Sequence, residues 1–302
     1  MSSRVPFLLA FVLIAILNPC VRSQSSDRRI SIAVLSFGDE AVGRRSSESL
    51  TARLREHSDI LILDADQTRA AAKGAGYAPS LNMATAEART LGAVMGSDFF
   101  LLGDAQTLRR SPSSGAVYFE SYASIFVVSS RSGQLVDWQR LSFQAAAQEG
   151  ATKLLVSALS QAAFSDRVVA SIRQAAQDEK TSREAAITKG VPVIEEAPSD
   201  EKSAAGEGLR LPRPYRRFQP SYPDSAAKAE AEAIVDVLVD LDANGEITHA
   251  EVARWAGFGL DEASLDTVRK LHFFPAMRNG VAVPLRVLLR YNFRKPPADR
   301  KQ

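Results

Sequence analysis

The sequence predicts a mixed α+β/α/β protein with two domains joined by a linker. Its 302 residues give room for about two domains. From residue 29 to residue 177, strand-like and helix-like segments alternate, as they do in α/β domains. Residues 178–212 are rich in Glu, Lys, Ser, Ala, Gly and Pro, a composition typical of linkers. Residues 213–296 return to alternating apolar and polar positions, which indicates a second, smaller domain.

The first 23 residues, 1–23, have the features of an export signal peptide. One Arg precedes the apolar run Phe7–Leu17, and the small residues Val21 and Ser23 stand where a signal peptidase reads the chain. The run is shorter than the roughly 20 apolar residues that a membrane-crossing helix needs. We therefore expect cleavage after Ser23 and a protein that resides in the periplasm.

The alternative is that residues 5–19 remain uncleaved and anchor the chain in the inner membrane. Cleavage would also remove Cys20, which is the only cysteine of the sequence. The mature chain would then have neither a disulfide nor a thiolate metal site, so its stability would come from packing.

The domain at 29–177 is expected to begin as a βαβ unit and to continue as an antiparallel meander. The turn-rich segments RRSPSSG and RSG separate three strand-like runs, which should therefore pair in sequence order. The expected strands are 29–37, 59–66, 98–108, 116–130 and 134–146. The expected helices are 46–58, a run from 68, a run within 85–98 with Gly96 as its stop signal, and a run from 152 to about 178.

The linker 178–212 is expected to behave as a flexible coil, because it has few large apolar side chains to bury. Such a coil would span on the order of 30 Å between its ends. The last residues, 297–302, are expected to form a short tail.

The second domain contains a strand pattern followed by a hairpin signal. Apolar residues alternate with acidic ones over 234–242, a period of two that favours a strand. The apolar set is Val235, Val237, Val239 and Leu241. Asn244-Gly245 comes next and predicts a two-residue hairpin turn, because both residues tolerate positive φ.

The same stretch offers calcium binding as an alternative interpretation. Asp240, Asp242, Asn244 and Glu251 fit the spacing of an EF-hand calcium loop, D-x-[DN]-x-[DN]-G-x₅-E. An EF-hand requires a helix on each side, whereas the segment before this loop predicts a strand. We therefore expect no metal site and no cofactor, with calcium binding at 240–251 as the alternative.

Four features of the second domain follow one another in a specific order. They are the segment Pro220–Pro223, the Asn-Gly hairpin, a helix at 261–271 that leads into Phe273-Phe274-Pro275-Ala276, and the turn Asn279-Gly280 before a last strand that ends at Phe293. In this order they resemble the TonB C-terminal domain over residues 213–296. The sequence departs from the family pattern at 232–233, where the family has a glycine, and at Leu271, where it has an aromatic residue. Both departures concern packing.

The resemblance implies a small β-α-β-β fold whose exposed edge strand accepts an extended peptide, the TonB box, from an outer-membrane receptor. Strand addition of this kind uses unpaired backbone N–H and C=O groups. By position, the resemblance places partner contacts on Arg217, Gln219 and Tyr222, and a pairing edge within Val283 to Tyr291. The alternation of Val283, Leu285, Val287 and Leu289 predicts that their side chains face the core, so recognition there should use the backbone. The alternatives are that Tyr222 only packs and that Arg217 is only solvated.

The first domain has a more diffuse resemblance. The order of its elements and the phrases LGAVMGSDFFLLGDAQ and VVSSRSGQLVD resemble the exported α/β domain of CsgG-like and TolB N-terminal-like proteins, over residues 29–165. This resemblance implies a role in assembly or protein contact, with a homo-oligomer as one form of it.

Several function classes have no support in the sequence. It contains no glycine-rich phosphate loop and no G-x-S-x-G motif, and its three histidines lie in separate elements, so we expect no enzyme activity. The 37 basic and 35 acidic residues are nearly balanced and scattered, so we expect no nucleic-acid partner. The expected partner is an outer-membrane TonB-dependent receptor or another envelope protein, and the expected role is peptide binding linked to transport across the outer membrane. The alternative within the same family is a membrane-anchored energy transducer.

Overall fold

The computed structural model describes residues 28–189, 194–198 and 200–295. The predicted signal peptide at 1–23, the alternative anchor at 5–19 and the predicted tail at 297–302 lie outside these residues. Within the described ranges, no helix combines the length and the apolar character that crossing a membrane requires. The structure has the mixed α/β composition that the sequence predicts.

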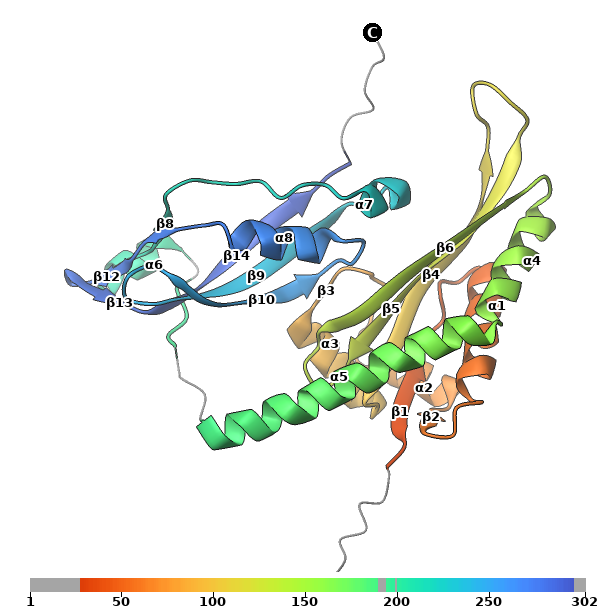
Figure 1. Ribbon diagram of the computed structural model, residues 1–302, viewed down its shortest axis with the longest axis horizontal. Coiled ribbons are helices and arrows are strands. Elements are labelled where there is room, and N and C mark those ends of the chain that lie inside the picture. Colours follow the sequence, from red (N-terminus) through yellow and green to blue (C-terminus); the bar gives the residue numbers. More distant parts are fainter. Residues whose placement is uncertain (1–27, 190–193, 199, 296–302) are drawn as a thin grey trace, which may run out of the picture.

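The N-terminal domain is built on one five-stranded sheet with the order β2-β1-β4-β5-β6 (Figure 1). β1 pairs in parallel with β2 and with β4, whereas β4, β5 and β6 form an antiparallel meander. The strands are β1 (Ile30–Val34), β2 (Ile60–Ile62), β4 (Phe99–Arg110), β5 (Tyr118–Ser129) and β6 (Leu135–Ala145).

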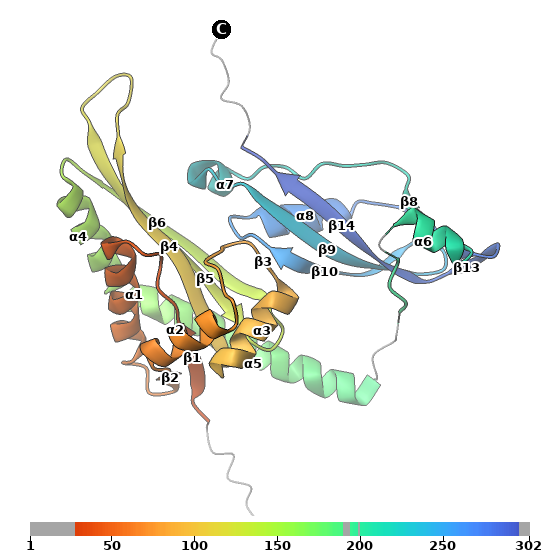
Figure 2. The ribbon, with the colours of Figure 1, turned by 180° about the vertical axis from the view of Figure 1, so that it is seen from behind.

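Helices cover the two faces of this sheet unequally. One face packs against α1 (Ala41–Leu54), α4 (Gln148–Leu159) and α5 (Ala162–Lys189) around an apolar cluster of its own. The other face packs against α2 (Ala65–Gly74) and α3 (Thr85–Met95), which Figure 2 shows from behind. These two short helices leave part of the second face uncovered, and the C-terminal domain packs there.

The C-terminal domain contains an antiparallel sheet of β14 (Leu285–Phe293), β9 (Ala233–Leu241) and β10 (Ile247–Trp255), in that order. The four apolar residues of β9 that the sequence predicts on one face are all buried. They share a cluster with residues of α7 (Asp224–Ala229) and α8 (Leu260–Val268). Alternation along one strand has therefore placed the core on the helix side of the sheet.

Short strands complete the far end of this domain. β12 (Ala276–Arg278) pairs with β13 (Val281–Val283) and with β7 (Leu209–Arg210), while β8 (Arg213–Pro214) pairs with β11 (Phe273–Phe274). Asn279 and Gly280 join β12 to β13 with φ of 48° and 86°. This is the two-residue turn that the sequence predicts, because both central residues have positive φ.

The flexible coil expected at 178–212 is wrong for the residues that the structure describes there. α5 continues through Lys189, and α6 (Glu201–Gly206) and β7 fold against the C-terminal domain. Ala204 and Leu209 are buried in a small cluster with Ala276 and Leu285. Composition misleads here because Ala, Glu, Lys and Arg are strong helix formers, and a few small apolar residues are enough for docking.

Aromatic residues join the two domains into one core. The Phe126 ring of β5 stacks on Trp255 of β10 at a centroid distance of 5.9 Å, and its edge meets Phe258 at 5.5 Å. Gly257, which lies between Trp255 and Phe258 in the sequence, has a φ of +71°. A Cβ at that position would lie 2.4 Å from Cε1 of Phe126. Glycine therefore allows both the backbone conformation and the close approach.

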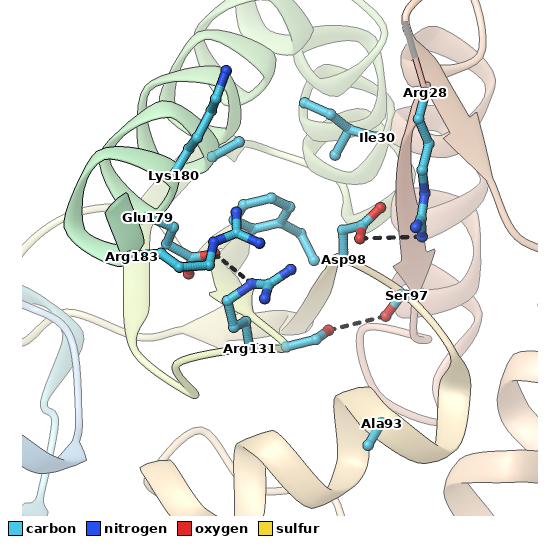
Figure 3. Close-up of a pocket in the computed structure, with 12 residues that line it drawn as sticks. Arg28, Ile30, Ala93, Ser97, Asp98, Arg131, Glu179, Lys180 and Arg183 are labelled. Atoms are coloured by element: carbon cyan, nitrogen blue, oxygen red, sulfur yellow. Dashed lines mark hydrogen bonds and ion pairs between the residues drawn. The ribbon is translucent and has the colours of Figure 1, made fainter. Parts of the chain in front are cut away.

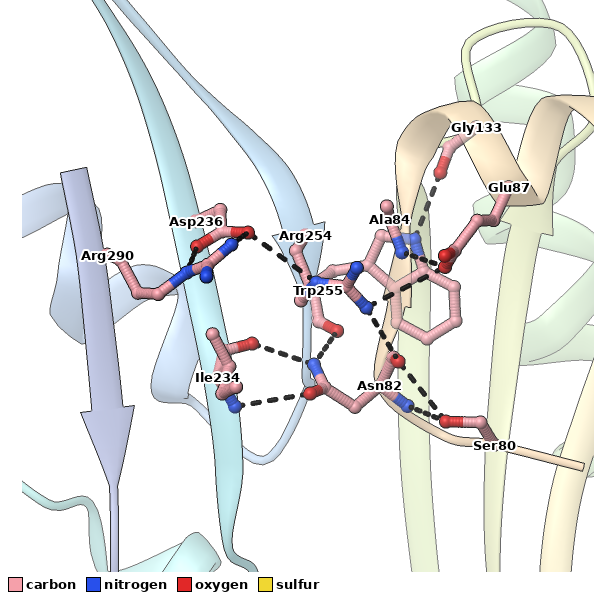
Figure 4. Close-up of polar contacts among 10 residues, drawn as sticks. All are labelled: Ser80, Asn82, Ala84, Glu87, Gly133, Ile234, Asp236, Arg254, Trp255 and Arg290. Carbon is pink, nitrogen blue, oxygen red and sulfur yellow. Dashed lines mark hydrogen bonds and ion pairs between the residues drawn. The ribbon is translucent and has the colours of Figure 1, made fainter. Parts of the chain in front are cut away.

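Polar groups complete the junction (Figure 4). β3 (Met83–Ala84), from the N-terminal domain, pairs antiparallel with Arg254 and Trp255 of β10. The Asn82 side-chain amide donates to the carbonyls of Ile234 and Trp255, each at 2.7 Å, and its oxygen accepts from the Ile234 N–H at 3.1 Å. One side chain thus satisfies three backbone groups of the other domain.

Candidate partner-binding edge

β14 forms the outer edge of the C-terminal sheet. It pairs with β9 along its whole length, from Leu285 opposite Leu241 to Phe293 opposite Ala233. On the opposite side of the sheet, β3 covers the end of β10. β3 covers only Arg254 and Trp255 of β10, whereas β14 is a full-length strand at the end of the sheet, which makes it the candidate edge for a partner strand.

The backbone of Arg286 shows which groups point outward. Its N–H donates to the Glu195 carbonyl at 2.8 Å, and its carbonyl accepts from the Ala197 N–H at 2.7 Å. Backbone groups alternate in direction along a strand, so those of Leu288, Arg290 and Asn292 point the same way. Within the described ranges these three residues have no backbone hydrogen bond on that side. We call Leu288–Asn292 the open edge.

The side chains beside the open edge leave little free charge. Arg286 binds Asp240 through two hydrogen bonds of 2.5 and 2.8 Å, and Arg290 binds Asp236 through two of 2.7 and 2.9 Å. The bond from Arg286 lowers the pKa of Asp240, so the carboxylate stays ionised. Leu288 lies between the two arginines and is 51% exposed. Besides its backbone groups, the open edge therefore exposes the side chains of Leu288, Arg290 and Asn292, of which Leu288 is apolar.

The residues predicted for the pairing edge face inward. Val283 belongs to β13 and pairs with Ala276, because Pro284 interrupts the strand before β14 begins. Leu285 is fully buried, and Val287 and Leu289 pack against the core clusters. The outward set at 288, 290 and 292 was not singled out in the sequence, although period two assigns those positions to the face opposite the apolar one.

The three contacts predicted before the first helix occupy different environments. Arg217 and Gln219 are exposed, in the extended connection that runs along the domain from β8 to α7 (Figure 1). The Tyr222 hydroxyl donates to the Ala231 carbonyl at 2.8 Å and its ring packs against the core. Burial raises the pKa of Tyr222. Tyr222 thus connects the segment before α7 to the residues that follow this helix. In the part of the chain that the structure describes, no hydrogen bond or ion pair joins any of the three side chains to β14.

The loop at 240–251 has the geometry of a hairpin and not of an EF-hand. Strands flank it on both sides, and Asp240 is bound to Arg286. The Asp242 carboxylate accepts from the N–H groups of Asn244 and Glu246 at 2.8 and 2.9 Å, and bonds of this kind lower its pKa. Among the described residues, no three or more His, Cys, Asp or Glu side chains gather in a way that could hold a metal ion.

This turn also differs from the expected two-residue form. The Asp242 N–H donates to the Glu246 carbonyl at 2.9 Å, so three residues, 243–245, form the loop. Only Gly245 has positive φ, at +85°. A Cβ there would lie 2.2 Å from the Phe273 carbonyl oxygen, so the close approach of β11 requires a glycine.

A second concave site lies on the N-terminal domain (Figure 3). It is a cavity of about 670 Å³ with Phe99 and Ile30 among its lining residues and four basic side chains: Arg28, Arg131, Lys180 and Arg183. Arg28 and Arg131 each lie 3.5 Å from a carboxylate, of Asp98 and Glu179 respectively. Figure 3 shows Arg131 and Arg183 extending into the same space. All four basic side chains are exposed to solvent, so this is a charged hollow of the surface.

Comparisons with known proteins assign the C-terminal domain. The family model of the Gram-negative bacterial TonB protein C-terminal matches residues 219–294. Protein TonB of Xanthomonas campestris pv. campestris, in strains B100 and ATCC 33913, is 36% identical over 75 residues, which are 24% of this chain and 34% of the relative. This chain therefore spans about a third of the length of the curated relatives it matches.

Solved structures are similar to part of the chain. The TonB C-terminal domain of Pseudomonas aeruginosa is 22% identical and covers 30% of this chain and 90% of its own, with a TM-score of 0.24. The LpoB C-terminal domain of Salmonella enterica is 15% identical, covering 38% and 83%, with a TM-score of 0.28. The PelC dodecamer of Paraburkholderia phytofirmans is 12% identical, covering 46% and 89%, with a TM-score of 0.28. The assignment rests on the sequence matches: residues 219–294 form a TonB C-terminal domain.

Proposed function

We propose that this chain is a non-enzymatic protein of the periplasm that binds a partner peptide by strand addition to β14. The partner is an outer-membrane TonB-dependent receptor or another envelope protein, and binding is linked to transport across the outer membrane. One observation carries the proposal: Leu288, Arg290 and Asn292 present unpaired backbone groups at the edge of a TonB C-terminal domain. Such groups accept an extended peptide by backbone hydrogen bonds.

The surroundings of the open edge favour a particular kind of peptide. Arg286 and Arg290 already bind carboxylates, so charge contributes little to selection there. The exposed Leu288 side chain favours an apolar residue opposite it in the partner strand. Arg217 and Gln219 remain proposed additional contacts, since both are exposed and Gln219 has a donor and an acceptor for a peptide backbone.

Replacing Leu288 with proline tests this proposal. Proline removes an N–H that points away from β9 and puts its ring where a partner strand would lie, while the ladder to β9 stays intact. Leu288→Ala is the matched control, because it removes the side chain and keeps the N–H. Synthetic TonB-box peptides from the receptors of the same genome would be titrated against the whole protein by fluorescence anisotropy.

We expect Leu288→Pro to weaken peptide binding by about tenfold or more, because at least one backbone hydrogen bond and the approach of the strand are lost. Leu288→Ala should retain most of the affinity. Equal affinities of the wild type and a folded Leu288→Pro variant would rule out strand addition at this edge.

A further inference from the structure

We propose that residues Glu195–Ala197, here called the strap, are a built-in competitor for the strand-addition site on β14. The inference rests on the proposed function and adds to it a regulation of the same edge. A partner strand that pairs with more than the open edge must first displace the strap.

The strap binds the same row of backbone groups that a partner would use. Its two hydrogen bonds take the N–H and the carbonyl of Arg286, which are in line with those of Leu288, Arg290 and Asn292. Glu196 lies opposite Arg286 in a parallel bridge. Because one N–H cannot donate to two strands side by side, the strap and a partner exclude each other at Arg286.

The contacts that hold the strap are few. Besides the two backbone bonds, Glu195 forms an ion pair of 2.6 Å with Arg278 at the surface, which is a weak restraint in water. Ala197 packs against the small cluster of Ala204, Leu209, Ala276 and Leu285. The strap makes a single bridge with β14, because the chain soon turns into α6, whose first turn is capped by Asp200.

The position of the strap in the chain keeps it close to β14 and so increases its ability to compete with a partner strand. It is tethered on its C-terminal side to α6 and β7, which pack against the same domain, so its effective concentration at β14 is high. The apparent affinity for a partner is reduced by the fraction of molecules in which the strap is bound. The strap therefore weakens the binding of partner strands that extend from the open edge to Arg286, and it leaves strands that pair only with Leu288–Asn292 unaffected.

Two proline variants separate the strap from its surroundings. Ala197→Pro removes the N–H that donates to the Arg286 carbonyl. Glu196→Pro is the matched control, because in a parallel bridge the backbone groups of the central residue point away from the partner strand. Both variants, the wild type and Leu288→Pro would be titrated with the same TonB-box peptides, and amide hydrogen exchange would be followed at Ala197 and Arg286.

We expect Ala197→Pro to bind the peptides about 3- to 10-fold more tightly than the wild type, which corresponds to the loss of one backbone hydrogen bond from the competitor. Glu196→Pro should stay within about twofold, since it keeps that bond. Peptide binding to the wild type should also speed exchange at the Ala197 amide, because the strap is released.

The results distinguish the failure of this inference from the failure of the proposed function. If Leu288→Pro abolishes binding while Ala197→Pro binds no more tightly than the wild type, the strap is not a competitor and strand addition stands. If Leu288→Pro leaves binding unchanged, or if none of the four proteins binds, both ideas are overturned. An Ala197 amide that stays protected when peptide saturates the protein would also overturn the strap.

Discussion

Replacing Asn82 with alanine tests whether the two domains unfold as one unit. The Asn82 side chain makes three hydrogen bonds to the backbone of Ile234 and Trp255, two of 2.7 Å and one of 3.1 Å. A hydrogen bond contributes a net ~0.5–1.5 kcal/mol to stability, so losing three should lower the free energy of unfolding by about 2–4 kcal/mol. The loss should affect both domains because the bonds cross between them.

Two further variants show whether the loss of stability comes from the hydrogen bonds of Asn82. Asn82→Asp keeps the shape of the side chain but turns its donor into an oxygen facing two carbonyl oxygens, so it should cost more than Asn82→Ala. Ser80→Ala is the control in the same loop, since the Ser80 hydroxyl bonds to the backbone of Asn82 and to no group of the other domain among the described residues. It should change stability by less than about 0.5 kcal/mol.

Urea unfolding measures these effects. The protein has two tryptophans, Trp138 and Trp255, and both contact Phe residues at the junction, so their fluorescence reports on it. Circular dichroism follows the secondary structure of both domains. We expect coincident transitions by the two probes. The reasoning is refuted if the wild type unfolds in two separate steps, or if Asn82→Ala changes the free energy by no more than Ser80→Ala.

Two other predictions concern the junction. Gly257→Ala should destabilise the protein by more than Gly76→Ala, because both glycines have left-handed φ but only a Cβ at 257 meets Phe126, and equal losses in urea unfolding would contradict this. Burial raises the pKa of Asp261 to about 7, so its contribution to stability is complete below the pKa of the unfolded chain, near about 4, and is lost as pH rises through about 7. The free energy of unfolding of the wild type, relative to that of Asp261→Asn, should fall between about pH 4 and pH 7. A difference that does not vary with pH would show that the pKa of Asp261 is not raised.

The parts of the fold that sequence could predict are those with a local signal. The strand β9 and the Asn279-Gly280 turn each depend on residues that are neighbours in the sequence. The period of two and the turn preference of Asn-Gly were therefore enough to predict them. The helix expected at 261–271 is α8, Leu260–Val268. It ends at Val268, and Leu271 is buried in the core ahead of β11.

The parts that could not be predicted depend on distant partners. β3 has two residues and no periodicity, and it is a strand only because β10 lies beside it. Asn82 has an ordinary loop context, so nothing local marks it as the residue that joins the domains. The strap could not be predicted for the same reason, since Glu195–Ala197 is polar and short and pairs with a strand some 90 positions away along the chain.

The position of an edge strand near the C-terminus could be predicted from the sequence, and which of its residues bind a partner stays a prediction. The resemblance indicated an edge strand near the C-terminus, and β14 is that strand. The side chains named for it were the apolar ones, because they stand out in the sequence. The outward backbone groups belong to the residues between them, and the ladder to β9 together with the bonds of Arg286 identifies that direction.

The pairing of β3 with β10 has a mechanical consequence. A peptide lying along β14 would be the first of five strands in a row, followed by β14, β9, β10 and β3. Tension along that peptide would load the hydrogen bonds of the row sideways and together, and would arrive in the N-terminal domain through Met83 and Ala84. If a partner peptide binds as proposed, a pull on it would therefore reach the N-terminal domain through paired strands as well as through the segment that connects the two domains.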